Sequence, residues 1–552
     1  MLFQAVRASA KLLGDIDTAG ESILHAVRAL LRVVAAGLEA DAPFQTFARM
    51  AENVARILLD LLLDVIEKIA KELGDDDEIR RLCLILDLGA ANLRGIFADQ
   101  LFAKGFDSIN EEDYTEWLGR HKCRNPWSAL VKAIYDVGFS FVKGKTDGAS
   151  GPAERPPSAS FEAGTLLRSA LLVFFGYRGS YVYKMQSGMG DTIFTPFYLA
   201  LRHRGVKFHF FHRVTNLSVS GDRIEAIDID RQVALKPEFS EYQPLYPVKG
   251  LPCWPNQPFF DQLAEGETLR QQRINLESAW SGWTGKSIRL ERGVDFDHVV
   301  LGISLGALPY ICGELIQARK EWADMVSNVA TAQTQSFQIW TTRTGQEMGW
   351  PSAEAALLGG YTEPIDTLSD MSQTLPYEDW NGAAAPKSVQ YWCGPMEDAA
   401  EIPPPGTKSD FPQRQLARVQ AEAVAFLQKD VRAIWPAATD PSNPDALDWS
   451  TLFDLHDRKG AARFDAQYIR ANIDPSERYV FARKGTWRYR LEPGKSGFRN
   501  LFLAGDWTLN GINAGCVESA ARGGALAAEA VSLAATAASA PLPPQQAFEA
   551  GR

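Results

Sequence analysis

The end of the chain carries the pattern that most constrains its fold. Residues 500–507 form a short apolar run that stops at Gly505 and Asp506. A glycine-rich turn follows over 511–518, and then a segment of small residues with helical character over 519–533. A buried strand that runs into such a turn and helix is typical of a parallel sheet with helices packed against it. The sequence therefore predicts an α/β fold with this strand inside a sheet.

The same turn has the chemistry of a dinucleotide site. Gly505 allows the backbone to approach a ligand closely, and Asp506 can accept hydrogen bonds from sugar hydroxyls. A helix that begins near Gly515 directs its free N–H groups and the positive end of its dipole toward the ligand. An ordinary strand–turn–helix is the alternative interpretation. The cofactor-binding candidates in this segment are Gly505, Asp506, Asn513, Ala514, Gly515, Cys516 and Val517.

Two further pieces precede this segment. The later one is an apolar strand over 295–304 that runs into a loop of small residues. The earlier one has alternating patterns typical of strands and a Ser-Gly-Asp turn typical of a hairpin. It comprises, in order, the turn Gly188-Met189-Gly190, a helix over 192–203, a strand over 206–211, and a hairpin of strands 214–219 and 223–229 joined by Ser220, Gly221 and Asp222.

These pieces, in this order, resemble the flavin-containing amine oxidase and phytoene desaturase superfamily. The resemblance places Gly188, Met189 and Gly190 in a turn before a helix, Val214 beside the adenine, and Asp506 beside the flavin. It implies FAD as the cofactor, lying extended between a dinucleotide-binding domain and a substrate domain. It also implies hydride transfer from a C–N or C–C bond of an apolar or amine substrate to the flavin, with oxygen or another acceptor as oxidant.

Within the superfamily the chain is similar to a bacterial subgroup described as NAD(P)-binding or FAD-dependent oxidoreductases and allied to carotenoid and hydroxysqualene-type desaturases. The similarity covers most of residues 100–535 and leaves the substrate open. It rests on the segments 105–107, 116–118, 184–186, 251–255 and 475–479.

One part of this family pattern does not occur in the sequence. Such proteins open with a strand, G-x-G-x-x-G and a helix, which bind the pyrophosphate. The sequence contains no G-x-G-x-x-G, and its early glycines Gly89 and Gly95 have the wrong spacing and a helical context. We therefore expect a two-domain fold of the FAD-oxidoreductase type that is incomplete, with apolar strand edges exposed and no activity in the chain alone. Either the chain is truncated or a separate chain supplies the missing unit.

The domain organisation follows from these motifs and from composition. Apolar residues repeat at helical spacing over 23–34 and 57–69, which predicts a bundle of helices near the N-terminus. Contact of these helices with a membrane surface, or a role as a lid over the substrate, is the alternative. The expected parts are a helical region over 1–104, an aromatic-rich segment and linker over 105–159, a partial FAD-binding domain from 160–232, 285–312 and 495–535, a substrate domain from 233–284 and 313–494, and a disordered tail over 536–552.

Composition excludes several other functions. The net charge of −11 argues against a nucleic-acid partner, which would require clustered basic residues. No C-x-x-C or Cys/His pair has metal-ligand spacing, and the seven histidines form no ligand cluster, so no metal site is expected. Isolated cysteines are typical of reduced, cytoplasmic proteins. No apolar run reaches the roughly 20 residues that a membrane span requires.

Three further sets of residues are candidates for a catalytic or substrate-binding role. Ser304 lies in Gly302-Ile303-Ser304-Leu305-Gly306, which matches the G-x-S-x-G pattern of serine hydrolases after a strand, but His456 is the only later histidine. Lys184 could hold a water near the flavin, as a lysine does in some amine oxidases; an exposed lysine on a strand is the alternative. The aromatic residues Trp254, Trp280, Trp283, Phe337, Trp340 and Trp392 fill a core or line an apolar substrate pocket.

A non-catalytic role is the further alternative. The chain would then be a fragment, or a binding protein built on a decayed oxidoreductase fold. No residue is singled out as a catalytic base.

Overall fold

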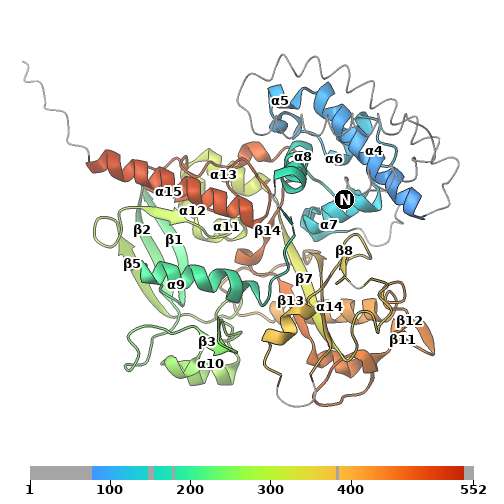
Figure 1. The fold of residues 1–552 in the computed structure, drawn as a ribbon. Helices are drawn as coiled ribbons and strands as arrows, with labels where there is room; N and C mark the ends of the chain where they lie inside the picture. Colours follow the sequence, from blue (N-terminus) through green and yellow to red (C-terminus); the bar gives the residue numbers. More distant parts are fainter. Residues whose placement is uncertain are drawn as a thin grey trace, which may run out of the picture.

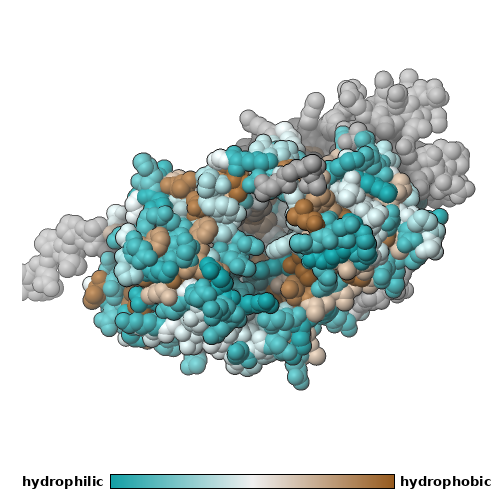
Figure 2. Space-filling view, turned by 90° about the horizontal axis from the view of Figure 1, so that it is seen from below, coloured by the Kyte–Doolittle hydropathy of each residue, from teal (hydrophilic) through white to brown (hydrophobic). Residues whose placement is uncertain are grey.

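The computed structural model describes residues 77–146, 155–176, 179–180, 182–352, 354–380 and 385–539. Helices and strands from distant parts of the chain intermix, which confirms the predicted α/β class (Figure 1). The helical repeats over 23–34 and 57–69 lie outside the described residues. No helix within the described ranges is long and apolar enough to cross a membrane. Seen from below, the surface is mostly hydrophilic, with hydrophobic residues gathered around a central hollow (Figure 2).

The largest sheet is antiparallel and is organised around β7 (Thr331–Thr341). The strand order is β13-β7-β10-β9-β8, and β14 pairs with the first residues of β7. Helix α14 (Phe411–Leu427) packs on this sheet, where Phe337, Trp392 and Phe426 share one core. The bounds are β8 (Leu357–Leu358), β9 (Thr367–Asp370), β10 (Ser388–Met396), β13 (Tyr468–Asn472) and β14 (Tyr479–Val480), with a separate hairpin of β11 (Thr439–Asp440) and β12 (Asn443–Leu447).

The predicted hairpin and the predicted parallel strand lie together in a second part of the molecule. The turn at Gly221 has φ of +60° and joins β1 to β2, with Ser220 paired to Arg223. Strand β15 runs parallel to β6, as the terminal motif predicts. One core connects both strands with the helices beside them. The bounds are β1 (His212–Ser220), β2 (Arg223–Arg231), β5 (Lys286–Glu291), β6 (Val299–Leu301), β15 (Leu501–Leu503), α11 (Leu308–Ile311), α12 (Gly313–Ala318), α13 (Lys320–Asn328) and α15 (Val517–Ser539).

Helices form a third part, at the upper right of Figure 1. Its core contains Trp117, Tyr135, Phe141 and Leu166. The aromatic residues of the segment that follows Gly105 therefore pack in the same core as the helix before it. The bounds are α4 (Asp77–Ala98), α5 (Leu101–Lys104), α6 (Tyr114–Arg120), α7 (Ala129–Val137) and α8 (Ala163–Leu171).

The predicted strand over 206–211 is wrong. Residues 206–210 are irregular and have no strand partner among the described residues, and the chain enters β1 only at His212. The rings of Phe208 and Phe210 pack on Tyr198 of α9 (Thr195–His203), while Val206 is 44% exposed. The alternation in this segment gives it two unlike faces, but a strand also requires a neighbour for its main-chain hydrogen bonds.

The end of α15 also differs from the expected tail. The helix extends to Ser539, so the first residues of the segment 536–552 are helical. Residues 540–552 lie outside the described ranges.

Candidate functional site

Strand β15 ends in a turn that requires glycine. Gly505 has φ of +137°, and a Cβ there would lie 2.6 Å from the indole nitrogen of Trp507. Gly523 of α15 lies directly against this turn, because a Cβ on it would lie 2.7 Å from the main-chain oxygen of Gly505. Small residues at both positions let helix α15 approach the end of β15, as the sequence predicts.

Two asparagines fix the loop between β15 and α15. Oδ1 of Asn513 accepts the main-chain N–H groups of Asn510 and Gly511 at 3.0 and 3.1 Å. Oδ1 of Asn510 accepts the N–H of Ile512 at 3.0 Å, and its Nδ2 donates to Oγ of Ser519 at 2.9 Å. The loop is therefore held by its own side chains and joined to the first turn of α15.

Gly515 anchors the start of α15 against β14. A Cβ on Gly515 would lie 2.3 Å from the main-chain oxygen of Val480, and the hydroxyl of Tyr479 donates to the carbonyl of Gly515. Burial raises the pKa of the Tyr479 phenol, so this hydroxyl stays protonated and remains a donor. Val517 is 57% exposed, so one side of the first turn is open.

Several buried donor groups surround this loop. Nη1 of Arg490 donates to the main-chain oxygen of Asp506 at 2.7 Å, and Nη2 of Arg168 donates to the main-chain oxygen of Ile512 at 3.3 Å. Other donors of the same neighbourhood have no acceptor among the described residues: Nε and Nη2 of Arg490, Nε of Arg168, Nε1 of Trp487, Nε1 of Trp507 and Nδ2 of Asn513. A buried donor without an acceptor costs about 1–3 kcal/mol, so this cluster indicates a place for a ligand rich in acceptor atoms.

A buried cation at this site is influenced by the charges of two carboxylates. Arg490 is 3% exposed, and burial lowers its pKa, although Glu162 and Asp506 act in the opposite direction. Glu162 is 0% exposed and accepts the main-chain N–H groups of Thr486 and Trp487 at 3.0 and 2.6 Å. Burial raises the pKa of both carboxyls, and the charge of Arg490 opposes that rise. The sequence does not predict a role for Arg490 or Glu162, because neither lies in a recognisable motif.

The turn at Gly188, Met189 and Gly190 precedes a helical segment, as predicted. The main-chain oxygen of Gly188 accepts the N–H of Thr192 at 3.0 Å. Trp254 closes this turn, because its Nε1 donates to the main-chain oxygen of Gly190 at 3.1 Å. Met189 is 46% exposed.

Lys184 and Val214 occupy different surroundings. Lys184 lies in an irregular segment and is half-buried, and its Nζ donates to the main-chain oxygen of Asp370 at 2.6 Å. The alternative of an exposed strand lysine is therefore wrong. Burial lowers the pKa of Lys184. Val214 lies in β1 and packs against the core that contains Leu503 and Trp507, so it shares a core with the C-terminal turn.

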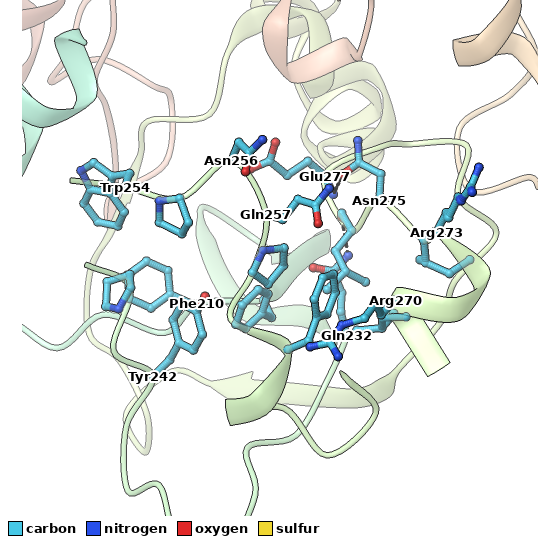
Figure 3. Close-up of a pocket in the computed structure, with 18 of the residues that line it drawn as sticks. Phe210, Gln232, Tyr242, Trp254, Asn256, Gln257, Arg270, Arg273, Asn275 and Glu277 are labelled. Atoms are coloured by element: carbon cyan, nitrogen blue, oxygen red, sulfur yellow. Dashed lines mark hydrogen bonds between the residues drawn. The ribbon is translucent and has the colours of Figure 1, made fainter. Parts of the chain in front are cut away.

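A groove of about 870 Å³ opens beside Trp254. It lies between the start of β1 and the helix α10 (Gly266–Gln272), near the hairpin of β3 (Tyr246–Val248) and β4 (Leu251–Cys253). Figure 3 shows aromatic rings on one side of the groove and amide and charged groups on the other. The labelled lining residues are Phe210, Gln232, Tyr242, Trp254, Asn256, Gln257, Arg270, Arg273, Asn275 and Glu277.

The aromatic residues of the middle region divide between the two predicted roles. Trp280, Phe337 and Trp392 are each 1% exposed or less and fill cores. Trp254 instead lines the groove, as an apolar pocket would require.

Ser304 is not arranged as a nucleophile. Its hydroxyl donates to the main-chain oxygen of Arg478 at 3.2 Å, and no described histidine bonds to it. His456 lies in an exposed turn, where its main-chain N–H is accepted by Asp454 at 3.0 Å. Gly306 has a packing role, because a Cβ there would lie 2.4 Å from the main-chain oxygen of Pro475. These contacts do not favour a serine hydrolase.

Comparisons with known proteins give similarity at the level of structure. No protein-family model and no curated protein matches the sequence. The chain is similar to the crystal structure of an oxidoreductase from Methanosarcina mazei, with a TM-score of 0.42 and 12% identity over 79% of this chain and 72% of that one. It is also similar to a putrescine oxidase redesigned in its cofactor binding, with a TM-score of 0.39 and 10% identity over 89% of this chain and 77% of that one. At this identity the likeness concerns the fold and assigns no activity to the chain.

Proposed function

We propose that the chain is the larger part of an FAD-dependent oxidoreductase related to amine oxidases and desaturases. The observation that carries the proposal is the set of buried donors without acceptors around the loop between β15 and α15. A flavin and its ribityl chain are rich in the acceptor atoms that these donors lack. When bound, FAD accepts a hydride from a C–N or C–C bond and passes the electrons to oxygen or another acceptor.

Different residues are proposed to hold different parts of this cofactor. Arg490, Trp507 and Asn513 supply donors, and the carboxylate of Asp506 accepts from sugar hydroxyls. The first turn of α15, which follows Gly515, places positive partial charge where the reduced ring carries negative charge. Following the resemblance, Val214 serves the adenine end, the turn from Gly188 to Gly190 also holds the cofactor, and Lys184 is a candidate for the substrate side.

The substrate is proposed to be apolar or an amine with an apolar body. The groove beside Trp254 supports this, because its aromatic side adjoins the turn at Gly190. Exclusion of water by these rings would favour hydride transfer over competing reactions with solvent.

The pyrophosphate is proposed to be held by a separate chain that carries a strand, G-x-G-x-x-G and a helix. Strand β6 has a single strand neighbour among the described residues, and its Val300 is 52% exposed. The unpaired segment 206–210 and the exposed Phe197 of α9 add further apolar surface. An added strand would bury such surface and satisfy the free edge.

Co-expression tests this proposal. The full chain is produced in the same cell as a polypeptide that contains a strand, G-x-G-x-x-G and a helix. The two should purify as a complex with flavin absorbance, whereas the full chain produced alone should be colourless. A complex that forms without flavin would overturn the proposed cofactor.

A further inference from the structure

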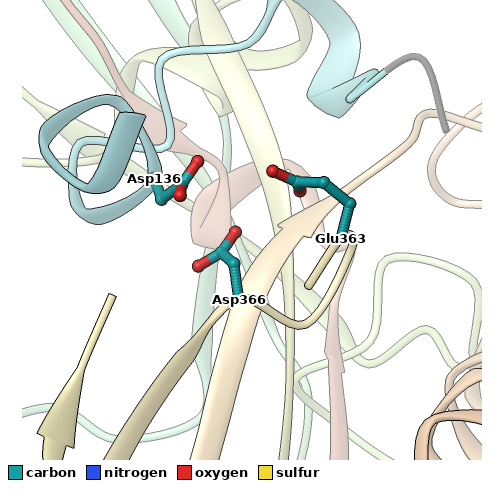
Figure 4. Close-up of side chains that lie close together, drawn as sticks. All are labelled: Asp136, Glu363 and Asp366. Atoms are coloured by element: carbon teal, nitrogen blue, oxygen red, sulfur yellow. The ribbon is translucent and has the colours of Figure 1, made fainter. Parts of the chain in front are cut away.

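Three carboxylates from distant parts of the chain meet inside the molecule. Asp136 lies near the end of α7, and Glu363 and Asp366 lie in the segment that enters β9. One ligand oxygen from each lies within 4.8 Å of the others, and Figure 4 shows the three groups directed toward one another. Asp136 and Asp366 are both 0% exposed.

The partners of these carboxylates leave half of their oxygens unsatisfied. Nζ of Lys132 lies 3.2 Å from Oδ2 of Asp136 and 2.6 Å from Oε1 of Glu363. Oδ1 of Asp366 accepts the hydroxyl of Thr367 at 2.6 Å. The second oxygen of each carboxylate is buried and has no partner in the described part of the chain: Oδ1 of Asp136, Oε2 of Glu363 and Oδ2 of Asp366.

The charges of the cluster do not balance. Three carboxylates face a single ammonium group, and buried carboxylate oxygens without partners are unfavourable. The cluster therefore needs additional positive charge, and a divalent cation would supply the amount that Lys132 leaves uncompensated.

We propose that Asp136, Glu363 and Asp366 bind a hard divalent cation of the Mg²⁺, Mn²⁺ or Ca²⁺ class. The cluster contains carboxylate oxygens and neither histidine nor cysteine, and oxygen ligands are those that these ions prefer. The cation would tie α7 of the helical part to the entrance of β9 in the large sheet. This inference is independent of the proposed cofactor and of the separate chain.

Manganese binding tests the site directly. The full chain, freed of metal with a chelator, is titrated with Mn²⁺ and followed by electron paramagnetic resonance and thermal melting. We expect one Mn²⁺ per chain and a rise in melting temperature with metal concentration. Asp366→Asn and Glu363→Gln, which keep the side-chain shapes, should each weaken binding at least ~10-fold. Glu347→Gln is the matched control, because it removes an exposed carboxylate that pairs with Lys387.

The following results would contradict the proposed metal site. Failure of the parent chain to bind Mn²⁺ or Ca²⁺ would overturn the proposal, whatever the variants do. Binding that persists in both Asp366→Asn and Glu363→Gln would place the metal elsewhere. A melting temperature raised by Asp366→Asn, in a parent chain that binds no metal, would show that the carboxylates share protons instead.

Discussion

The guanidinium of Arg490 donates from Nη1 to the main-chain oxygen of Asp506 at 2.7 Å, and two more of its nitrogens are buried without an acceptor. This contact joins the turn at the end of β15 to a buried charge on a segment that precedes the strand. The charge of Glu162 also stabilises the charged guanidinium. The loop that is proposed to hold the flavin is thus positioned by electrostatics as well as by packing.

Arg490 and Glu162 should be energetically coupled. Arg490→Met leaves the buried Glu162 without its opposing charge. This loss should lower the free energy of unfolding by about 3–5 kcal/mol. The double variant Arg490→Met with Glu162→Gln should be less destabilised than the sum of the two single variants, because both charges are then removed. Urea unfolding of the four proteins measures this coupling. Additive effects would show that the two charges do not interact.

Adjacent glycines of α15 should respond in opposite directions to alanine. Gly523→Ala places a Cβ 2.7 Å from the main-chain oxygen of Gly505 and should destabilise the fold by about 1–3 kcal/mol. Gly524→Ala meets nothing within 4 Å and should stabilise the helix by about 0.5–1 kcal/mol. Thermal or chemical unfolding compares the two. Equal effects at both positions would contradict the close contact between α15 and the turn after β15.

Asp474 should make stability depend on pH. It is 8% exposed, and burial raises its pKa to about 6 from 3.8, so the folded state binds its proton more tightly than the unfolded state. The contribution of Asp474 to the free energy of unfolding is therefore present below pH 4. It falls as pH rises from about 4 to 6 and stays low above that. Asp474→Asn should match the parent below pH 4 and be more stable by ~3 kcal/mol above pH 6.

The measurement is urea unfolding of both proteins across this range. The asparagine can still accept the main-chain N–H of Ala279, which Oδ1 of Asp474 accepts at 2.6 Å. A difference between parent and variant that does not change with pH would contradict the raised pKa.

A substitution at Val300 should test whether the separate chain binds at the free edge of β6. Val300→Lys places a charge on the exposed face of this edge strand, and charged side chains on an edge strand oppose pairing with a further strand, so the substitution should abolish co-purification with the G-x-G-x-x-G chain. Because Val300 is 52% exposed, the stability of the chain alone should change by no more than about 0.5 kcal/mol. Val294→Lys is the control, since Val294 is 79% exposed in the turn between β5 and β6. Complex formation that survives Val300→Lys would exclude this edge as the contact surface.

The sequence predicts those features that depend on local pattern. The hairpin at Gly221 and the strand that ends at Gly505 each have a short signature, because a turn or a crossover demands particular residue types. The prediction of a strand over 206–211 is wrong because an alternating pattern shows only that a segment has two unlike faces. It cannot reveal whether a partner strand is present. The alternative of a nucleophilic Ser304 is not favoured for a similar reason, since G-x-S-x-G also satisfies ordinary packing.

The remaining features depend on residues that only the fold brings together. Arg490 and Glu162 are 328 residues apart in the chain, and Asp136 and Asp366 are 230 residues apart. No spacing rule links such residues, so the buried donors of the C-terminal loop and the carboxylate cluster could be found only from the three-dimensional arrangement.

The flavin affinity of the completed complex shows whether the buried donors around the loop after β15 hold the cofactor. The complex with the G-x-G-x-x-G chain is prepared as the parent and with Arg490→Lys or Arg488→Lys, and FAD binding is titrated by quenching of flavin fluorescence. Arg488 is the matched control, because it lies two residues away and forms an exposed pair with Glu111. The account predicts that Arg490→Lys weakens FAD binding by at least about 10-fold, since one buried hydrogen bond to a charged group contributes roughly 1.5–3 kcal/mol, while Arg488→Lys leaves it unchanged. Equal FAD affinity in the parent and both variants would contradict the claim that the buried donors around the loop after β15 hold the flavin.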